Sequence, residues 1–163
     1  MCLLYSISFM LSTPHVLVGI FLIDRFPNIC GLVLALLSHF LLDFCIPHWN
    51  PHLYTEFKKQ GKISKTSLKI IILDIITAIG ATLYFMSLKL PNLSLALLYG
   101  LASFMAILPD FVEIPYYFFR SKSVLLKKYV YFEHKYQAGA GVFWGGLIQI
   151  LIGLAALKSL LTF

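Results

Sequence analysis

Charged residues are scarce in this chain of 163 residues, where they make up 12% of the sequence, against about a quarter in a soluble domain. Hydrophobic residues make up 60%, and the mean hydropathy is +0.86. This composition excludes a soluble protein, and the short length excludes large domains outside a membrane. At about 20 apolar residues per crossing, the chain has room for four or five transmembrane helices.

Cysteine and acidic residues are also few. Cys2, Cys30 and Cys45 are odd in number, lie in apolar stretches and form no Cys-x-x-Cys pair, so they predict neither a disulfide framework nor a thiolate zinc site. Seven Asp and Glu stand against 13 Lys and Arg, which gives a formal charge of +6. In so apolar a chain, membrane topology and anionic headgroups explain this charge better than nucleic acid, which is not expected as a partner.

Five apolar stretches predict the fold class: an all-α integral membrane protein, a single domain over residues 1–163, built as a bundle of about five transmembrane helices. The stretches are 1–23, 29–46, 70–88, 93–108 and 138–157. Thr13-Pro14 is typical of a cap followed by proline in a first helical turn, so residues 1–12 either belong to the first helix or form a separate piece. Gly141-x3-Gly145 predicts a thin face for close helix packing in the last helix.

Two polar connections, 47–69 and 109–137, hold or adjoin ten of the 13 basic residues. These are Lys58, Lys59, Lys62, Lys65, Lys69, Arg120, Lys122, Lys127, Lys128 and Lys135. In a five-crossing alternation both connections lie on the same side as the N-terminus. The positive-inside rule predicts that this side is cytoplasmic and that the C-terminus faces out. We therefore expect a multi-pass protein of the inner or plasma membrane with two basic cytoplasmic loops.

The histidines and most acidic residues gather toward that same predicted side. They are His15, His39, Asp43, His48, His52, Asp74, Asp110, Glu113, Glu133 and His134, while Asp24 and Glu56 lie elsewhere. An unpaired charge inside a membrane is costly, so such a cluster is by default a candidate functional site. Asp74, which lies in an apolar stretch, is expected to support a ligating histidine.

The strongest local pattern is Ser38-His39-x3-Asp43-x3-Pro47-His48. Residues four apart project from one face of a helix, so His39 and Asp43 can reach the same cation. Pro47 ends the helix, and for His48 to share that cation its imidazole must return to within about 6 Å of Asp43, since zinc bonds are about 2.0 to 2.2 Å long. The alternative is a hydrogen-bonded His-Asp pair without a metal.

This segment resembles the His-x3-Asp-x3-Pro-x-His segment of the zinc-dependent phospholipase C and S1/P1 nuclease superfamily. Together with Thr13-Pro14-His15 and Leu108-Pro109-Asp110, it is similar to motifs of the YdjM-like, or DUF457, membrane-bound metal-dependent hydrolases. The chain departs from the soluble relatives where His48 follows Pro47 directly, where the Pro-Asp element comes after the His-x3-Asp helix, and where Gln137 stands in place of a carboxylate. These departures argue against a complete three-metal centre.

The resemblance implies a hydrolase of phosphoesters, with lipid phosphates as the natural substrate class and membrane lipids as partners. It implies a divalent metal, with zinc expected, and Asp43 and Asp110 as catalytic residues. The metal ligands would be a subset of His15, His39, Asp43, His48, Asp110 and His134, with Glu113 ranked last. A metal ion would activate water for attack on phosphorus.

A function without catalysis stays open at this point. The same polar residues could form a buried His/Asp network in a small scaffold protein, or a pathway for protons or divalent ions. A pathway should place polar residues at several depths in the membrane. Their confinement to one side favours a site.

Overall fold

A computed structural model describes residues 11–49 and 51–162, and within them the regular secondary structure is entirely helical. The helices are α1 (Ser12–Arg25), α2 (Ile29–Cys45), α3 (Leu53–Gln60), α4 (Lys65–Leu88), α5 (Leu93–Tyr117), α6 (Val124–Tyr136) and α7 (Val142–Leu161). The predicted all-α class is confirmed. Pro14 lies in the first turn of α1, as predicted, but the N-cap residue is Leu11, so the predicted cap at Thr13 is wrong. Residues 1–10 of the first predicted stretch lie outside the described residues.

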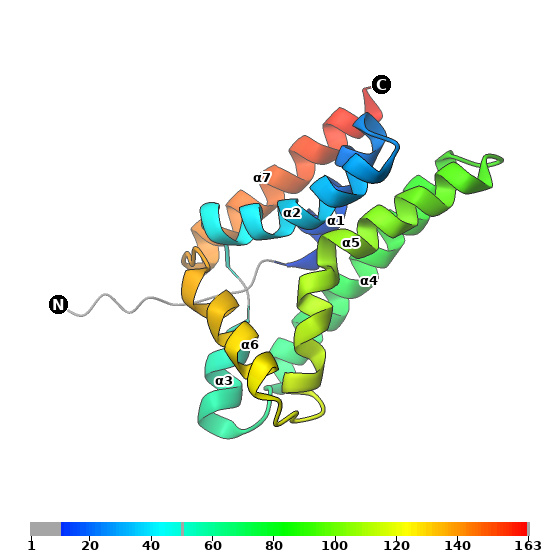
Figure 1. The fold of residues 1–163 in the computed structure, drawn as a ribbon. Coiled ribbons are helices and arrows are strands. Elements are labelled where there is room, and N and C mark those ends of the chain that lie inside the picture. Colours follow the sequence, from blue (N-terminus) through cyan, green and yellow to red (C-terminus); the bar gives the residue numbers. More distant parts are fainter. Residues whose placement is uncertain (1–10, 50, 163) are drawn as a thin grey trace.

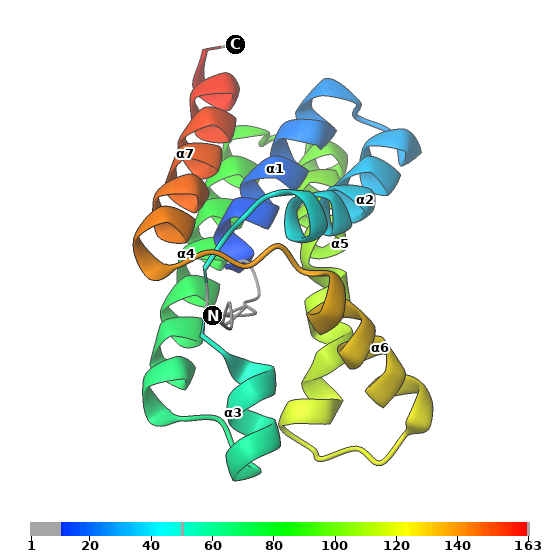
Figure 2. The same cartoon turned by 90° about the vertical axis from the view of Figure 1, so that its left-hand side faces the viewer.

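Helices α4 and α5 run along the long axis of the molecule. Helices α1, α2 and α7 lie beside the upper part of that pair, and α3 and α6 lie near its lower end (Figure 1). Helix α1 is central and packs against α2, α4, α5 and α7. Helices α3 and α6 lie at one end, and the C-terminus lies at the other (Figure 2). The turn between α1 and α2 lies on the same side as the C-terminus.

Three of the described helices are long and apolar enough to cross a membrane: α4 with 24 residues, α5 with 25 and α7 with 20. Helices α1 and α2 have only 14 and 17 residues, short of the about 20 that a crossing needs. The predicted count of five transmembrane helices is therefore not supported. The polar residues Asp24, Arg25 and Asn28 lie around the α1–α2 turn and separate the two apolar helices.

Helix α5 continues beyond the predicted end at residue 108 and runs to Tyr117. Pro109 and Pro115 lie inside it. A proline removes one helical hydrogen bond and crowds the carbonyl four residues earlier, which kinks a helix, and α5 bends along its length (Figure 1). Asp110 and Glu113 are consequently helical residues rather than the start of a loop.

Each basic connection contains a short helix that the sequence analysis treated as loop. Helices α3 and α6 are too polar to resemble membrane segments, but they share a small apolar cluster with the end of α5. It is built around Tyr117 and Val130 and includes Leu53, Tyr54, Phe57, Leu126 and Tyr129. The cluster places both connections at one end of the molecule, as predicted, and all ten of their basic side chains are exposed.

Small residues let α1 and α5 approach closely. A Cβ added to Gly19 of α1 would lie 2.7 Å from the Ala106 Cβ and 3.0 Å from the Ala102 carbonyl oxygen of α5. Ala35 of α2 is fully buried in the same core. One helical turn from this contact, α1 carries His15 and α5 carries Asp110, so the crossing brings both toward α2.

Replacing Gly19 with alanine should therefore destabilise the fold. The new methyl group has no room, and overpacking of this kind costs about 1 to 3 kcal/mol. Gly80→Ala is the matched control, since a Cβ at Gly80 meets no described atom within 4 Å and alanine favours the helix by about 1 kcal/mol. Thermal unfolding of the purified protein in detergent measures both variants. Equal stability of the two would contradict the close crossing.

The predicted orientation can be tested by cysteine labelling in intact cells, in a background without the native cysteines. Lys62 lies in the basic end and Thr162 follows α7, and both residues are exposed. With three crossings the two positions lie on opposite sides of the membrane, as they do with five. A membrane-impermeant maleimide added outside should label Thr162→Cys but not Lys62→Cys. Labelling of Lys62→Cys alone would reverse the orientation.

Candidate metal centre

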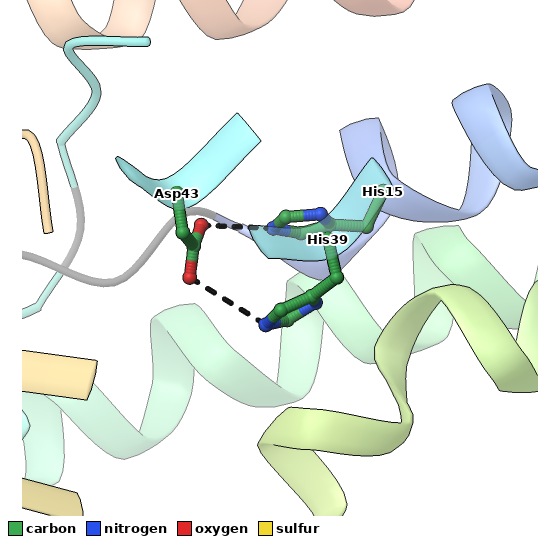
Figure 3. A group of neighbouring side chains, drawn as sticks. All are labelled: His15, His39 and Asp43. Atoms are coloured by element: carbon green, nitrogen blue, oxygen red, sulfur yellow. Dashed lines mark hydrogen bonds and ion pairs between the residues drawn. The ribbon is translucent and has the colours of Figure 1, made fainter. Parts of the chain in front are cut away.

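Three buried side chains meet where α1 and α2 come together (Figure 3). His15, His39 and Asp43 are each fully buried, and each offers one ligand atom such that the three atoms lie within 4.8 Å of one another. The Asp43 carboxylate lies beside the two rings, and each of its oxygens faces one of them (Figure 3). Its Oδ1 is 3.2 Å from His15 Nε2, and its Oδ2 is 3.5 Å from His39 Nε2. This group could hold a metal ion.

The local structure explains why these side chains converge. His39 and Asp43 lie on one face of α2, as the spacing of four residues predicted. His15 comes from the first turn of α1, and its ring stacks on that of His39 with centroids 4.3 Å apart. Two helices therefore supply the group.

Backbone carbonyls determine which ring nitrogens carry hydrogen in two of the histidines. His39 Nδ1 lies 2.8 Å from the carbonyl oxygen of Ala106, and His48 Nδ1 lies 2.8 Å from that of Ile46. A carbonyl oxygen only accepts, so each Nδ1 is the donor. In the neutral ring, each Nε2 then holds a lone pair.

Both of these lone pairs are directed at the same buried carboxylate. His39 Nε2 lies 3.5 Å from Asp43 Oδ2, and His48 Nε2 lies 3.9 Å from Asp43 Oδ1. His39 Nε2 is buried and has no hydrogen bond with any described residue. Acceptors facing one another repel unless a proton or a metal cation lies between them. A ring whose Nδ1–H is held by a carbonyl is also the usual arrangement of a metal-ligating histidine.

His48 is held in place by the chain between α6 and α7. The Asp43 carbonyl accepts from Ala138 N–H at 2.8 Å, and His48 N–H donates to the Ala138 carbonyl at 3.0 Å. His48 and Gly139 form a parallel bridge. The pairing returns His48 to the end of α2, inside the 6 Å that the sequence analysis required.

Gly145 of α7 lets this segment pass close by. A Cβ on Gly145 would lie 2.4 Å from Trp49 N and 2.6 Å from the His48 carbonyl carbon. The glycine face predicted to pack against another helix thus packs, at Gly145, against an extended segment. A Cβ on Gly141 or Gly146 would meet no described atom within 4 Å.

Asp110 lies at the edge of the group. Its Oδ1 is 3.8 Å from His39 Nε2, and its side chain is 25% exposed, whereas those of His39 and Asp43 are 0% and 1% exposed. The bend in α5 carries it there. Asp110 is therefore the acidic residue of the group that a molecule outside the core could reach.

The structure does not bring His134 into this group. Its ring packs against that of Tyr54 of α3, with centroids 3.9 Å apart and the ring planes tilted by 32°. Burial, and to a lesser extent the positive charge of Lys58, lowers its pKa to about 4. His134 thus belongs to the contact between α3 and α6.

Asp74 also acts differently from the prediction, because it contacts backbone rather than a histidine. Its Oδ2 accepts from Ser12 N–H at 2.6 Å, and its Oδ1 accepts from Thr13 N–H at 3.1 Å and from the Thr13 hydroxyl at 2.6 Å. A carboxylate that accepts from the first N–H groups stabilises the start of a helix. Asp74 thereby anchors the turn of α1 that carries His15.

Two further residues contribute to the surroundings of the group, although the sequence analysis named neither as a ligand. Gln137 donates from Nε2 to Asp43 Oδ2 at 3.1 Å, so it orients the carboxylate. Glu133, one turn earlier, is fully buried. Burial raises its pKa, a hydrogen bond from Tyr129 opposes the shift and the Asp43 charge adds to it, so that the pKa lies at about 7. The spacing of four residues between Glu133 and Gln137 was the sequence signal that the two side chains point to the same side.

Comparison of the chain with protein-family models, with curated proteins and with solved structures finds no match. The ligand and catalytic roles taken from the motif resemblance therefore stay predictions.

His39→Ala and Asp43→Ala should each abolish tight metal binding, because each removes a ligand atom from the buried group. His52→Ala should retain the metal, since His52 is the N-cap residue of α3 and is not one of the three grouped residues. His134→Ala should retain it too, because the His134 ring packs against Tyr54 and not against the grouped residues. Metal content after purification and dialysis, measured by plasma mass spectrometry, separates the variants. Equal metal content in all four would show that this group is no metal site.

Proposed function

We propose that the protein is a membrane-embedded hydrolase that cleaves phosphoesters at the cytoplasmic face with the help of a divalent metal ion. His15, His39 and Asp43 would hold the metal, and His48 would complete the set. The observation that carries the proposal is the pair of histidine Nε2 atoms, each fixed by a backbone carbonyl, that face one buried carboxylate.

The donor set favours a catalytic metal over a purely structural one. Neutral imidazoles and a carboxylate suit Zn²⁺, and catalytic zinc sites combine three such protein ligands with an open position. Within the described residues neither cysteine, Cys30 or Cys45, is buried, so no thiolate closes the site. When bound, a divalent metal would polarise a phosphoryl oxygen and lower the pKa of water.

Residues of this chain would do the remaining work. Asp110, partly exposed and 3.8 Å from His39 Nε2, is positioned to accept a proton from the attacking water. Gln137 would keep the Asp43 carboxylate oriented toward the histidines. The carbonyls of Ala106 and Ile46 would hold the two rings in the tautomer that can bind metal.

The surroundings of the site favour an anionic substrate. The exposed basic side chains of the α3 and α6 connections lie at the end of the molecule nearest the group. Positive charge around a site raises the local concentration of anions and speeds their association. Phosphoesters of membrane lipids or of soluble molecules both meet this requirement.

The protein purified in detergent and loaded with Zn²⁺ or Mn²⁺ should hydrolyse bis(p-nitrophenyl) phosphate or p-nitrophenyl phosphate, and a chelator should stop the reaction. Asp110→Asn should lower kcat by about 10² to 10⁴-fold, the usual contribution of a general base, while the metal content stays unchanged. His52→Ala is the control and should keep full activity.

A different outcome would favour the alternative function. Protein that binds no metal and shows no hydrolysis with added Zn²⁺, Mn²⁺ or Mg²⁺ would leave a hydrogen-bonded His/Asp network in a protein without catalysis. Hydrolysis that is unchanged in Asp110→Asn would remove only the role assigned to Asp110.

A further inference from the structure

A groove of about 750 Å³ runs between α1, α4 and α5. Its walls are mainly aliphatic and aromatic, with Val16, Ile79, Leu83, Phe104 and Ile107 among the lining residues. This volume lies within the about 300 to 1,000 Å³ of pockets that hold small molecules. The molecule therefore carries a binding-sized apolar space beside the polar group.

The ionisable side chains of the groove lie away from its Gly100 end. On α5 the lining residues run from Gly100 to Phe119, with Asp110 and Glu113 in the middle of that range, and Ser12 and Asp74 line the groove as well. Further along, Thr82 and Ser103 also line it, but their hydroxyls donate to carbonyls of their own helices at 2.9 and 3.0 Å. The far part of the groove thus offers mainly hydrocarbon contacts.

The apolar part has the length of one membrane leaflet. From Asp110 to Gly100, the most distant lining residue on α5, the helix rises ten residues, or about 15 Å at 1.5 Å per residue. The hydrocarbon core of a bilayer is about 30 Å thick. Since α4 and α5 are both candidate membrane spans, the groove runs along the direction in which lipid chains lie.

The groove is continuous with the candidate metal centre through one side chain. Asp110 lines the groove and also lies 3.8 Å from His39 Nε2. A molecule in the groove would therefore place its polar end at the His/Asp group. Its apolar end would lie near Leu83 and Gly100.

We propose that the groove holds an alkyl chain of a lipid phosphoester whose phosphate lies at the metal centre. This inference rests on the proposed function and narrows it, because it assigns a lipid rather than a water-soluble substrate. A lipid phosphoester matches both halves of the space: an anion beside the metal ligands and the basic end, and a hydrocarbon chain along α4 and α5.

Photocrosslinking tests the position of the chain without requiring turnover. The probe is palmitoyl lysophosphatidic acid with a diazirine near the end of its acyl chain, added to the purified protein in detergent. Peptide mapping should place the crosslinks near Leu83 and Gly100. Unlabelled palmitoyl lysophosphatidic acid should compete, whereas glycerol 3-phosphate, which has a similar head and no chain, should not.

Filling the groove should displace the probe. Thr82→Trp and Gly100→Phe put bulk into the apolar part, away from the metal ligands, and each should lower specific crosslinking at least about tenfold, a change worth about 1.4 kcal/mol. At Gly100 the nearest neighbour is the flexible Met86 side chain, with Sδ 3.0 Å from an added Cβ, and Thr82→Trp serves if Gly100→Phe fails to fold. Gly80→Trp is the matched control on α4, because Gly80 faces open space and should keep full labelling.

The outcomes separate the two proposals. Crosslinks that map to described residues outside the groove, or equal labelling of Thr82→Trp and Gly80→Trp, would overturn the lipid-chain assignment even if the protein binds metal and hydrolyses soluble phosphoesters. Competitive crosslinking in the groove of a protein that holds no metal would support a lipid-chain site and remove the hydrolase proposal.

Discussion

The buried carboxylate of Asp43 is the constraint on which the arrangement of the helices depends. Removing a carboxylate from water costs several kcal/mol unless it finds compensating partners. His15 and Gln137 are hydrogen-bonded to the Asp43 carboxylate, and the Nε2 atoms of His39 and His48 lie 3.5 and 3.9 Å from it, where a shared cation would compensate the charge. These four side chains come from α1, α2, the segment after α2 and the end of α6. A single charged group thereby ties together parts of the chain that are up to 122 residues apart.

The backbone around this group is held by contacts that keep each partner in place. Asp74 of α4 anchors the first turn of α1, and Gly19 allows α1 to lie against α5. The hydrogen bonds between Asp43, Ala138 and His48 join the ends of α2 and α6. At the far end, Asp24 pairs with Lys89 at 3.0 Å and accepts from the Tyr99 hydroxyl. Contacts between helices therefore fix the backbone both near the site and at the opposite end of the molecule.

The polar and apolar features are arranged along one axis. The basic side chains lie outermost at one end, and the His/Asp group lies inward of them, beside an apolar groove that extends past the group toward the other end. This order matches the headgroup, the phosphate and the acyl chain of a lipid in a bilayer. Large exposed apolar side chains on α4, such as Leu73, Ile76 and Leu83, are explained in the same way, because lipid rather than water would cover them.

The sequence by itself determined the helical class, the approximate position of five of the helices and the shared face of His39 and Asp43. These follow from hydropathy and from the 3.6-residue period, which are local properties. The gathering of ten basic side chains at one end was predicted on the same basis. The length of α5 was not, because proline ends an isolated helix but only bends one that packs on its neighbours.

Only the tertiary structure decided which polar residues meet. His15 reaches Asp43 because α1 packs against α2, and His48 returns because the segment at Ala138 pairs with it. His134 and Asp74 have the same residue types as the site, but His134 contacts Tyr54 and Asp74 accepts hydrogen bonds from the start of α1. A side chain's chemistry can be read from its own position in the sequence. Its partner depends on contacts between segments that are distant in the chain, and local sequence patterns do not predict those contacts.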